Sequence, residues 1–380
     1  MYNKKLHTYI NRLYGNPEAL QGFVFDLEFF GEEHFIKLLK EVGVEYYREV
    51  ASKHGLPNTD IYIEFVNDNT VNALATYFET TPLICINIGC LLNIFHYSLL
   101  LTMRNDFFPS IGDLEECANT VKISDYGFPQ ISNGEAGLWE IEFYSGTDDV
   151  SRQTLATMIT SMAHDFLVFH ELGHHILGHT KYLSKVYGIT YLQAQKSENL
   201  NQIDNVIIQS MEAHADVYAI NALLNKIITG LDLYFKLDFL ETSCDKTKVI
   251  FEMFITAISL VFLLLDNDGI DSDNFSSAYY LPRQYRLDLI LTSFRDYIVK
   301  NHDNCLSKYC MQIDDLYLTI AQIYHENEAK IDQMRNHSGF NSNDELSFED
   351  KVSIYYKTRI LTTWELLKRD LSSYAIVELI

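Results

Sequence analysis

The sequence predicts an α+β protein in which a small sheet precedes a long buried helix. Apolar residues alternate with other residues over 61–65 and again over 84–88, and such alternation is typical of strands. Over 155–176 the apolar residues recur at the spacing of a helix. Apolar residues make up 47% of the 380-residue chain and aromatic residues 13%, which is enough for a sizeable core.

The order of these segments divides the chain into three parts. Residues 1–56 are expected to form an N-terminal helical segment that ends at the Gly-Leu-Pro sequence at 55–57. Residues 57–230 would hold both strands and the long helix, with an insertion over 104–153 that is richer in Gly, Pro and polar residues. Residues 231–380 would form a helical region packed on that core. The chain is long for one core, but its length does not require a second.

Local patterns assign several further segments. Residues 138–143 alternate like a hairpin strand, so the insertion is either a lid over a cleft or an ordinary surface insertion. Residues 181–202 are expected to be a loop. The run 249–265 is almost wholly apolar, but it is short for a membrane span and contains an acid, so we expect a buried core helix. Two more helices are predicted near 304–335 and 348–371.

The long helix carries the pattern His-Glu-x-x-His at His170, Glu171 and His174. Positions four apart share a face of a helix, so both imidazoles can reach one metal ion. Glu171 lies about 100° round the helix, from where its carboxylate can reach a water molecule at the metal without being a ligand. Histidines and an acid on a buried helix need partners, and a metal supplies them. The alternative is a solvated helix that is simply rich in histidine.

A zinc site needs a third protein ligand, and residues 211–219 supply a candidate. Glu212 and Asp216 are again four apart, so Glu212 can complete a His, His, Glu set while Asp216 holds the second ring nitrogen of a ligand histidine. Two alternatives stay open. The two acids could form an exposed acidic face, or His179 could be the third ligand, because Gly178 can end the helix and turn the chain back.

These residues resemble the gluzincin metallopeptidases, and most of all the phage-exclusion peptidases of the Lit type. Three short motifs carry the resemblance, namely His-Glu-Leu-Gly-His, Gly-His and Glu-x-x-Ala-Asp, at 170–174, 178–179 and 212–216. Residues 71–76 and 84–89 are similar to the Asn-Ala segment and edge strand that precede the active-site helix in such enzymes. The resemblance spans 60–290. It implies a zincin-like core, with the last edge strand free to pair with an extended substrate.

The resemblance implies a zinc-dependent endopeptidase that hydrolyses a peptide bond of an intracellular protein. Zinc would be held by His170, His174 and Glu212, with Asp216 behind a ligand histidine. Glu171 would act as general base and then as proton donor. The competing hypothesis is a zinc-binding regulatory or interaction module without turnover. The presence of Glu171 favours turnover, because a structural site has no use for a base beside an open position.

Residues 280–286 stand where relatives carry a His-Pro followed by an Arg, with Tyr280 in place of the histidine. The resemblance therefore implies that Tyr280 or Arg286 stabilises the oxyanion that forms on attack. Lit-type relatives also imply a translation factor as the target and defence against phage as the context. Since an unregulated cytoplasmic peptidase would harm its own cell, we expect a partner or signal to gate the activity.

Charge and cysteine usage narrow the partners and the compartment. The formal net charge of −23 argues against nucleic acid or an anionic membrane as a partner, because both repel it. The six cysteines form no Cys-x-x-Cys pair and suit a reducing compartment. A second zinc site built from Cys85 with Cys90 and Cys305 with Cys310 is disfavoured by the five-residue spacing. No apolar run follows the first residues, so a cytoplasmic protein without a secretory signal is predicted.

Overall fold

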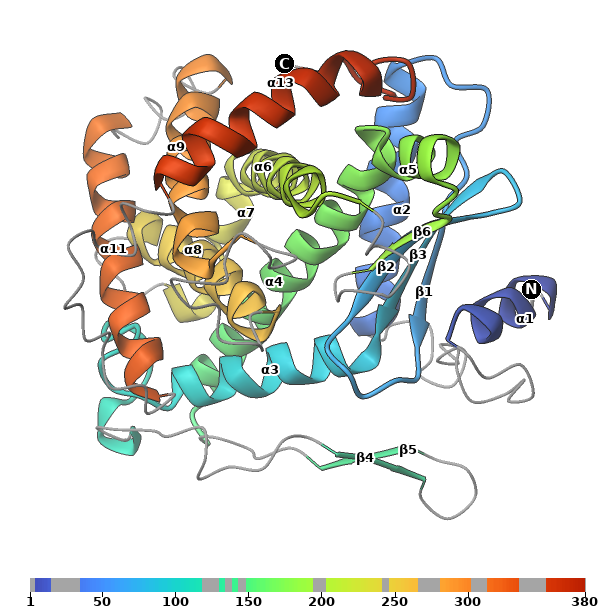
Figure 1. Cartoon of the computed structure of the whole chain (residues 1–380). Coiled ribbons are helices and arrows are strands. Elements are labelled where there is room, and N and C mark those ends of the chain that lie inside the picture. The colour runs from blue at the N-terminus through green and yellow to red at the C-terminus, as the bar shows by residue number, and fades with distance from the viewer. Residues whose placement is uncertain are drawn as a thin grey trace.

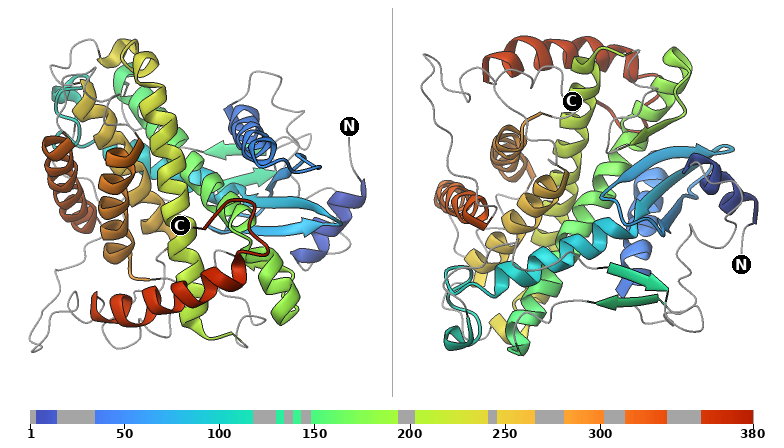
Figure 2. Two further views of the ribbon diagram at one scale, coloured as in Figure 1. Left: turned by 90° about the horizontal axis from the view of Figure 1, so that it is seen from above. Right: turned by 60° about the horizontal axis from the view of Figure 1, so that its bottom comes forward.

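The protein is mainly helical, with one four-stranded sheet at one side (Figures 1 and 2). The α+β class expected from the sequence is therefore confirmed. The computed structural model describes residues 4–14, 35–117, 130–133, 139–142, 148–193, 203–240, 246–265, 281–301, 313–334 and 353–379.

The sheet has the strand order β1-β3-β2-β6. Its strands are β1 (Tyr62–Val66), β2 (Ala73–Phe78), β3 (Thr81–Asn87) and β6 (Tyr191–Gln193). Strand β3 runs parallel to β1 and antiparallel to β2, and β6 pairs antiparallel with β2. The strands predicted at 61–65 and 84–88 are thus confirmed. The prediction that the second of them is a free edge strand is wrong, because β1 and β2 flank it on both sides.

Strand β2 explains that error. It is rich in alanine, which has a low strand propensity. It joins β3 through a two-residue turn at Glu79-Thr80, in which Glu79 takes the left-handed conformation (φ 56°) without the usual Gly or Asn. Neither the strand nor its turn therefore carries a strong local signal.

The alternation in the strands separates two layers of core. Ile63, Phe65, Ile84 and Ile86 face the main hydrophobic cluster. The intervening side chains, including Cys85, pack in a second cluster with Leu6 and Ile10 of α1 (Lys4–Leu13). Both faces of the sheet are consequently covered, which is why β3 is buried along nearly its whole length.

Helix α4 (Val150–Ile176) lies at the centre of the molecule (Figure 1). It starts at Asp149, whose carboxylate accepts hydrogen bonds from the backbone N–H groups of Ser151 and Arg152, at 2.7 and 3.2 Å. Its neighbours are α2 (Phe35–Lys53), α3 (Ile88–Thr102), α6 (Asn205–Thr229) and α8 (Lys246–Leu265). Because helices surround it, α4 is buried over most of its length, as its apolar spacing predicts.

Three more helices pack on the outer sides of α6 and α8 (Figures 1 and 2). They are α9 (Arg283–Asn301), α11 (Ile313–Met334) and α13 (Leu361–Leu371), the last preceded by a π-helical turn, Tyr356–Ile360. Within the described residues, α11 and α13 confirm the two C-terminal helices predicted at 304–335 and 348–371. One hydrophobic cluster runs from Leu39 to Tyr324, so the three predicted parts of the chain share a core.

Helix α8 is buried, as expected for the apolar run at 249–265. Among the described residues it is the one helix long and apolar enough to cross a membrane, and 83% of that stretch is buried inside the protein. Its side chains form the part of the main cluster that lies against α4.

Two connections also bear on the predictions. The strand predicted at 138–143 is confirmed as β5 (Trp139–Glu142), which pairs with β4 (Gln130–Asn133). This hairpin lies beside α3, on the side of the molecule opposite α13 (Figures 1 and 2). The loop expected at 181–202 is wrong over its described part, since α5 (His179–Tyr187) and β6 occupy most of it.

Gly178 sets the angle between α4 and α5. Its backbone is left-handed (φ 83°), and a Cβ added there would lie 2.7 Å from the backbone of Tyr374 and Ala375. Two features therefore require glycine at this position: the left-handed backbone conformation and the close contact with the backbone of residues 374–375. The prediction that Gly178 ends the helix and turns the chain is confirmed.

We expect Gly178→Ala to lower the free energy of unfolding by about 2–4 kcal/mol, through left-handed strain plus a backbone clash. Gly188→Ala is the matched control, because Gly188 is also left-handed (φ 70°) but has nothing within 4 Å of an added Cβ. It should cost only the strain, about 1 kcal/mol. Urea midpoints of the three proteins measure both values, and equal losses would show that the 374–375 contact contributes nothing.

Candidate metal centre

The candidate centre forms where α4 crosses α6. A Cβ added to Gly173 would lie 3.4 Å from Ala215 Cα and 3.3 Å from Tyr218 Cδ1, so glycine on one helix and alanine on the other allow a close approach. One helical turn from this contact, Glu212 of α6 faces His170 and His174 of α4.

The three predicted ligands come together. His170 Nε2 lies 3.1 Å from Glu212 Oε2 and 3.2 Å from His174 Nε2. His174 Nε2 lies 3.6 Å from Glu212 Oε1. One donor atom from each residue falls within 4.8 Å of the others, and all three side chains are buried.

These separations fit a small tetrahedral ion. Ligands bound to zinc at about 2.0–2.1 Å would stand about 3.3–3.4 Å from one another. The two imidazole nitrogens stand close to that distance, at 3.2 Å, and each lies near a different oxygen of Glu212, at 3.1 Å (Oε2) and 3.6 Å (Oε1). Two imidazoles and one carboxylate are also a donor set that zinc accepts in hydrolytic sites. His170, His174 and Glu212 can therefore hold a metal ion.

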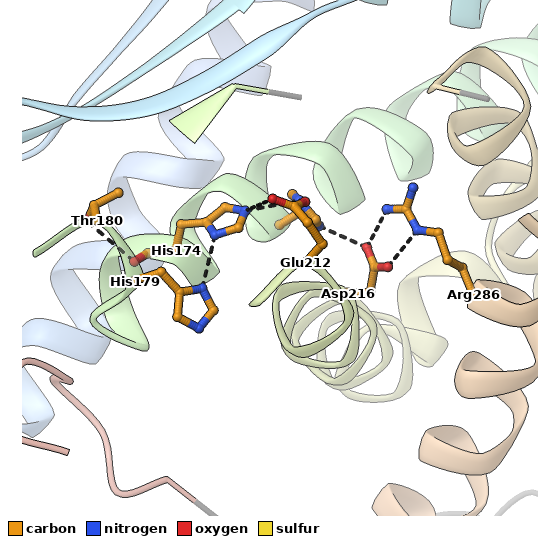
Figure 3. Close-up of polar contacts among 7 residues, drawn as sticks. His174, His179, Thr180, Glu212, Asp216 and Arg286 are labelled. Atoms are coloured by element: carbon orange, nitrogen blue, oxygen red, sulfur yellow. Dashed lines mark hydrogen bonds and ion pairs between the residues drawn. The ribbon is translucent and has the colours of Figure 1, made fainter. Parts of the chain in front are cut away.

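Asp216 stands behind His170, as the sequence predicts. Its Oδ1 lies 2.9 Å from His170 Nδ1, the ring nitrogen that faces away from Glu212. Asp216 in turn accepts two hydrogen bonds of 2.7 Å from the guanidinium of Arg286 on α9. Figure 3 shows Arg286 and Asp216 at one end of the polar chain and His179 at the other. This carboxylate fixes the orientation and tautomer of His170.

Arg286 is buried and binds Asp216, the carboxylate that holds His170. Its guanidinium carbon lies 4.0 Å from the centre of the Phe262 ring, which holds it from another side. The expected role in stabilising an oxyanion stays a prediction, and the contacts found favour a role in positioning Asp216. Tyr280, the other candidate for that role, lies outside the described residues.

Two further histidines lie near the ligand group, His179 beside His174 and His175 beside the sheet. His179 Nδ1 lies 3.0 Å from His174 Nδ1, whereas the other ring nitrogen of His174, Nε2, faces His170 and Glu212. The geometry thus favours Glu212 over His179 as the third ligand. His175 points away toward the sheet, where its Nε2 lies 3.3 Å from the carbonyl oxygen of Leu83. It joins α4 to β3 and takes no part in the ligand group.

Two residues beside the centre escape the sequence analysis. His214 lies within the Glu-Ala-His-Ala-Asp stretch of α6, and its ring centroid is 5.6 Å from that of His179. Trp364 of α13 lies 3.6 Å from His214, measured between ring centroids. The position of His214 between two site acids is a signal that could have found it. Trp364 has no such signal, because only the folded chain brings α13 to α6.

Glu171 is 2% exposed. Burial raises its pKa to about 7, against the charges of His170 and His174, which lower it. A carboxylate with a pKa near neutrality can both accept and release a proton at physiological pH. The charge of Glu171 also contributes to raising the pKa of the Cys85 thiol on β3.

The buried ligands hold a proton when no metal is bound. Burial disfavours a charged imidazole, but hydrogen bonds to Asp216 and Glu212 outweigh it and raise the pKa of His170 to about 10. Burial would raise the pKa of Glu212, yet the charges and hydrogen bonds of His174 and His170 lower it to about 2. The metal-free centre is thus an imidazolium between ionised carboxylates.

The second zinc site that the sequence disfavours gains no support. Cys85 and Cys90 lie on different elements and are free and buried. Burial raises the pKa of both thiols, and neither belongs to the one possible ligand group found among the described residues. Cys305 and Cys310 lie outside the described residues.

No family model matches the sequence, and no match was found among curated proteins or solved structures. The functional argument therefore depends on the geometry and chemistry of the centre.

We expect Glu212→Gln to lose bound zinc, because a neutral amide oxygen replaces an anionic ligand. Glu252→Gln is the matched control, since Glu252 is a buried acid of α8 that is not in the ligand group. Metal content after dialysis against a weak chelator, measured by mass spectrometry, checks this. If the Glu212 variant keeps zinc and His179→Ala loses it, the ligand assignment is wrong.

Zinc affinity should rise with pH. Since the pKa of His170 without metal is about 10, zinc must displace its proton at pH 7 to 9. The apparent affinity is expected to rise roughly tenfold per pH unit in this range and to level off above the pKa. Chelator competition at three pH values measures the slope. Asp216→Asn removes a group that raises this pKa and should flatten the slope, and a pH-independent affinity of the natural chain would contradict the protonation described.

Proposed function

We propose that this chain is a zinc-dependent endopeptidase. The observation that carries the proposal is the buried set of His170, His174 and Glu212 with Glu171 next to it on the same helix. Structural zinc sites usually close with four protein ligands, whereas the described residues supply three. A three-ligand set leaves a position for substrate, and the adjacent carboxylate supplies a base.

When bound, zinc would supply Lewis acidity to the carbonyl group of the scissile peptide bond. Glu171 would accept a proton from the attacking water molecule and then deliver it to the leaving amine. Burial, which raises the pKa of Glu171 in the metal-free chain, favours its taking up a proton. Asp216 and Arg286 would keep the ring of His170 oriented while this occurs. Stabilisation of the oxyanion by Tyr280 or Arg286 remains part of the proposal, inherited from the gluzincin resemblance.

The substrate we propose is one folded protein of the cytoplasm, cut in an exposed loop. The Lit-type resemblance supports a translation factor as target and defence against phage as context. The formal charge of −23 favours a protein over nucleic acid or an anionic membrane as partner. Burial of the centre supports gating, because a peptide must displace part of the covering chain before it meets Glu171.

The second candidate is a zinc-binding regulatory or interaction module without turnover. The same burial favours it, since a centre only 2–3% exposed at its ligands and at Glu171 is also what a closed structural site needs. A measurement of metal binding alone does not distinguish the endopeptidase from the module without turnover. Substitution of Glu171, the proposed base, does.

Glu171→Gln should retain zinc and lose hydrolysis by about 10² or more, because the amide keeps the shape of the side chain but cannot accept a proton. The test compares cells that express the natural chain with cells that express this variant, by sequencing newly formed protein N-termini. Metal content of both purified proteins is the control for folding.

One or a few new N-termini that depend on Glu171 would support a selective endopeptidase. A broad ladder of cleavages would contradict selectivity and favour a housekeeping peptidase. Equal N-termini in both cultures, with and without phage infection as trigger, would favour the module without turnover.

A further inference from the structure

The two ligand histidines are held from behind by different partners. His170 faces a carboxylate through its Nδ1, which is a common arrangement for a metal-binding imidazole. His174 instead faces the Nδ1 of another histidine, His179, at 3.0 Å. Both rings are buried, at 2% and 0% exposure. The contact is therefore shielded from water, and one of the two nitrogens must donate to the other.

Metal binding decides which nitrogen donates. If His174 Nε2 binds the metal, its proton must be on Nδ1, because a neutral imidazole carries one proton. His174 then donates to His179, whose Nδ1 must be the unprotonated acceptor. The remaining proton of His179 lies on its Nε2. The contact thus has one direction in the metal-bound chain, from the ligand outward.

The next polar atoms outward are also available. His179 Nε2 and His214 Nδ1 are both buried without a hydrogen-bond partner. The ring centroids of His179 and His214 lie 5.6 Å apart. The ring of Trp364 packs beside both, with its centroid 3.6 Å from that of His214 and 6.5 Å from that of His179. The rings of His179 and His214 thus pack beside each other next to Trp364.

We infer that His179 is a positioning residue of the metal centre, which holds His174 in the tautomer and orientation that ligation requires. The inference rests on the metal centre of the proposed function but not on turnover. The left-handed Gly178 turns the chain so that His179, the first residue of α5, comes back against α4. His214 and Trp364 form the outer support of this contact.

The partner chosen for His174 has a chemical consequence. A carboxylate partner raises the basicity of a ligand imidazole, whereas a neutral imidazole raises it less. His174 is consequently the weaker donor of the two histidines, and the ion keeps more of its Lewis acidity. An acceptor is nevertheless required, because a buried N–H without a partner is costly.

The experiment compares four purified chains: the natural one, His179→Asn, His179→Phe and the control His164→Phe. Asparagine can place an acceptor oxygen close to the position of Nδ1, whereas phenylalanine keeps the ring and removes the acceptor. His164 is a fully buried histidine of α4, the helix that carries His174, and it stacks on Phe65 outside the ligand group. Zinc affinity is measured by chelator competition, and Co²⁺-loaded samples report the imidazole N–H protons of the ligands in paramagnetically shifted NMR spectra.

His179→Phe should weaken zinc binding about 10- to 100-fold, and His179→Asn should stay within about threefold of the natural chain. Two slowly exchanging ligand N–H signals are expected for the natural chain, and the signal of His174 should be lost in His179→Phe alone. Unchanged affinity and two intact signals in His179→Phe would overturn the inference. Equal weakening in His164→Phe would also overturn it, since the effect would then be one of packing.

These outcomes are distinct from failure of the proposed function. A natural chain that binds zinc, shows the His179 effect and hydrolyses nothing would remove the peptidase and leave the positioning role. A natural chain that binds neither zinc nor cobalt would overturn both.

Discussion

The centre depends on the close contact between α4 and α6 at Gly173 and Ala215. Two ligands lie on one helix and the third on the other, so the distance between the helices decides whether the donor atoms meet. A larger residue at Gly173 would meet Tyr218 and Ala215 at the limit of ordinary contact. Helices α2, α3 and α8 pack against α4 from other sides, so the contact is held by the whole core and not by the ligands themselves.

Charge balance explains why such a polar group is tolerated inside that core. Glu212 and Asp216 bring two negative charges and Arg286 one positive charge, all in buried side chains. In the metal-free chain with Glu171 protonated, the proton on His170 offsets the difference. When a divalent cation replaces the proton of His170, the two added positive charges and an ionised Glu171 would again balance the buried charges. The fold thus has a neutral buried state with and without metal, which limits the desolvation cost of each.

Local chemistry was predictable from the sequence, and long-range pairing was not. The helix with His170, Glu171 and His174, and the pair Glu212 and Asp216, follow from i, i+4 spacing, which a helix alone determines. Strand β6 and the interior position of β3 depend on partners that are distant in sequence. For the same reason, the sequence suggests His179 as a possible third ligand, whereas the structure places it behind His174. Spacing shows that it returns to the centre, but only packing shows which nitrogen of His174 it meets.

The C-terminal segment connects the metal centre to the surface of the molecule. The backbone N–H of Ile376 donates to the carbonyl oxygen of Ile176, the last residue of α4, at 2.7 Å. Ser210 of α6 lies 3.4 Å from the carbonyl oxygen of Ile360, and Trp364 lies against His214. One segment therefore contacts both ligand-bearing helices and the support of His179. Displacement of this segment would therefore disturb the packing of both helices and of the residues around His179 together.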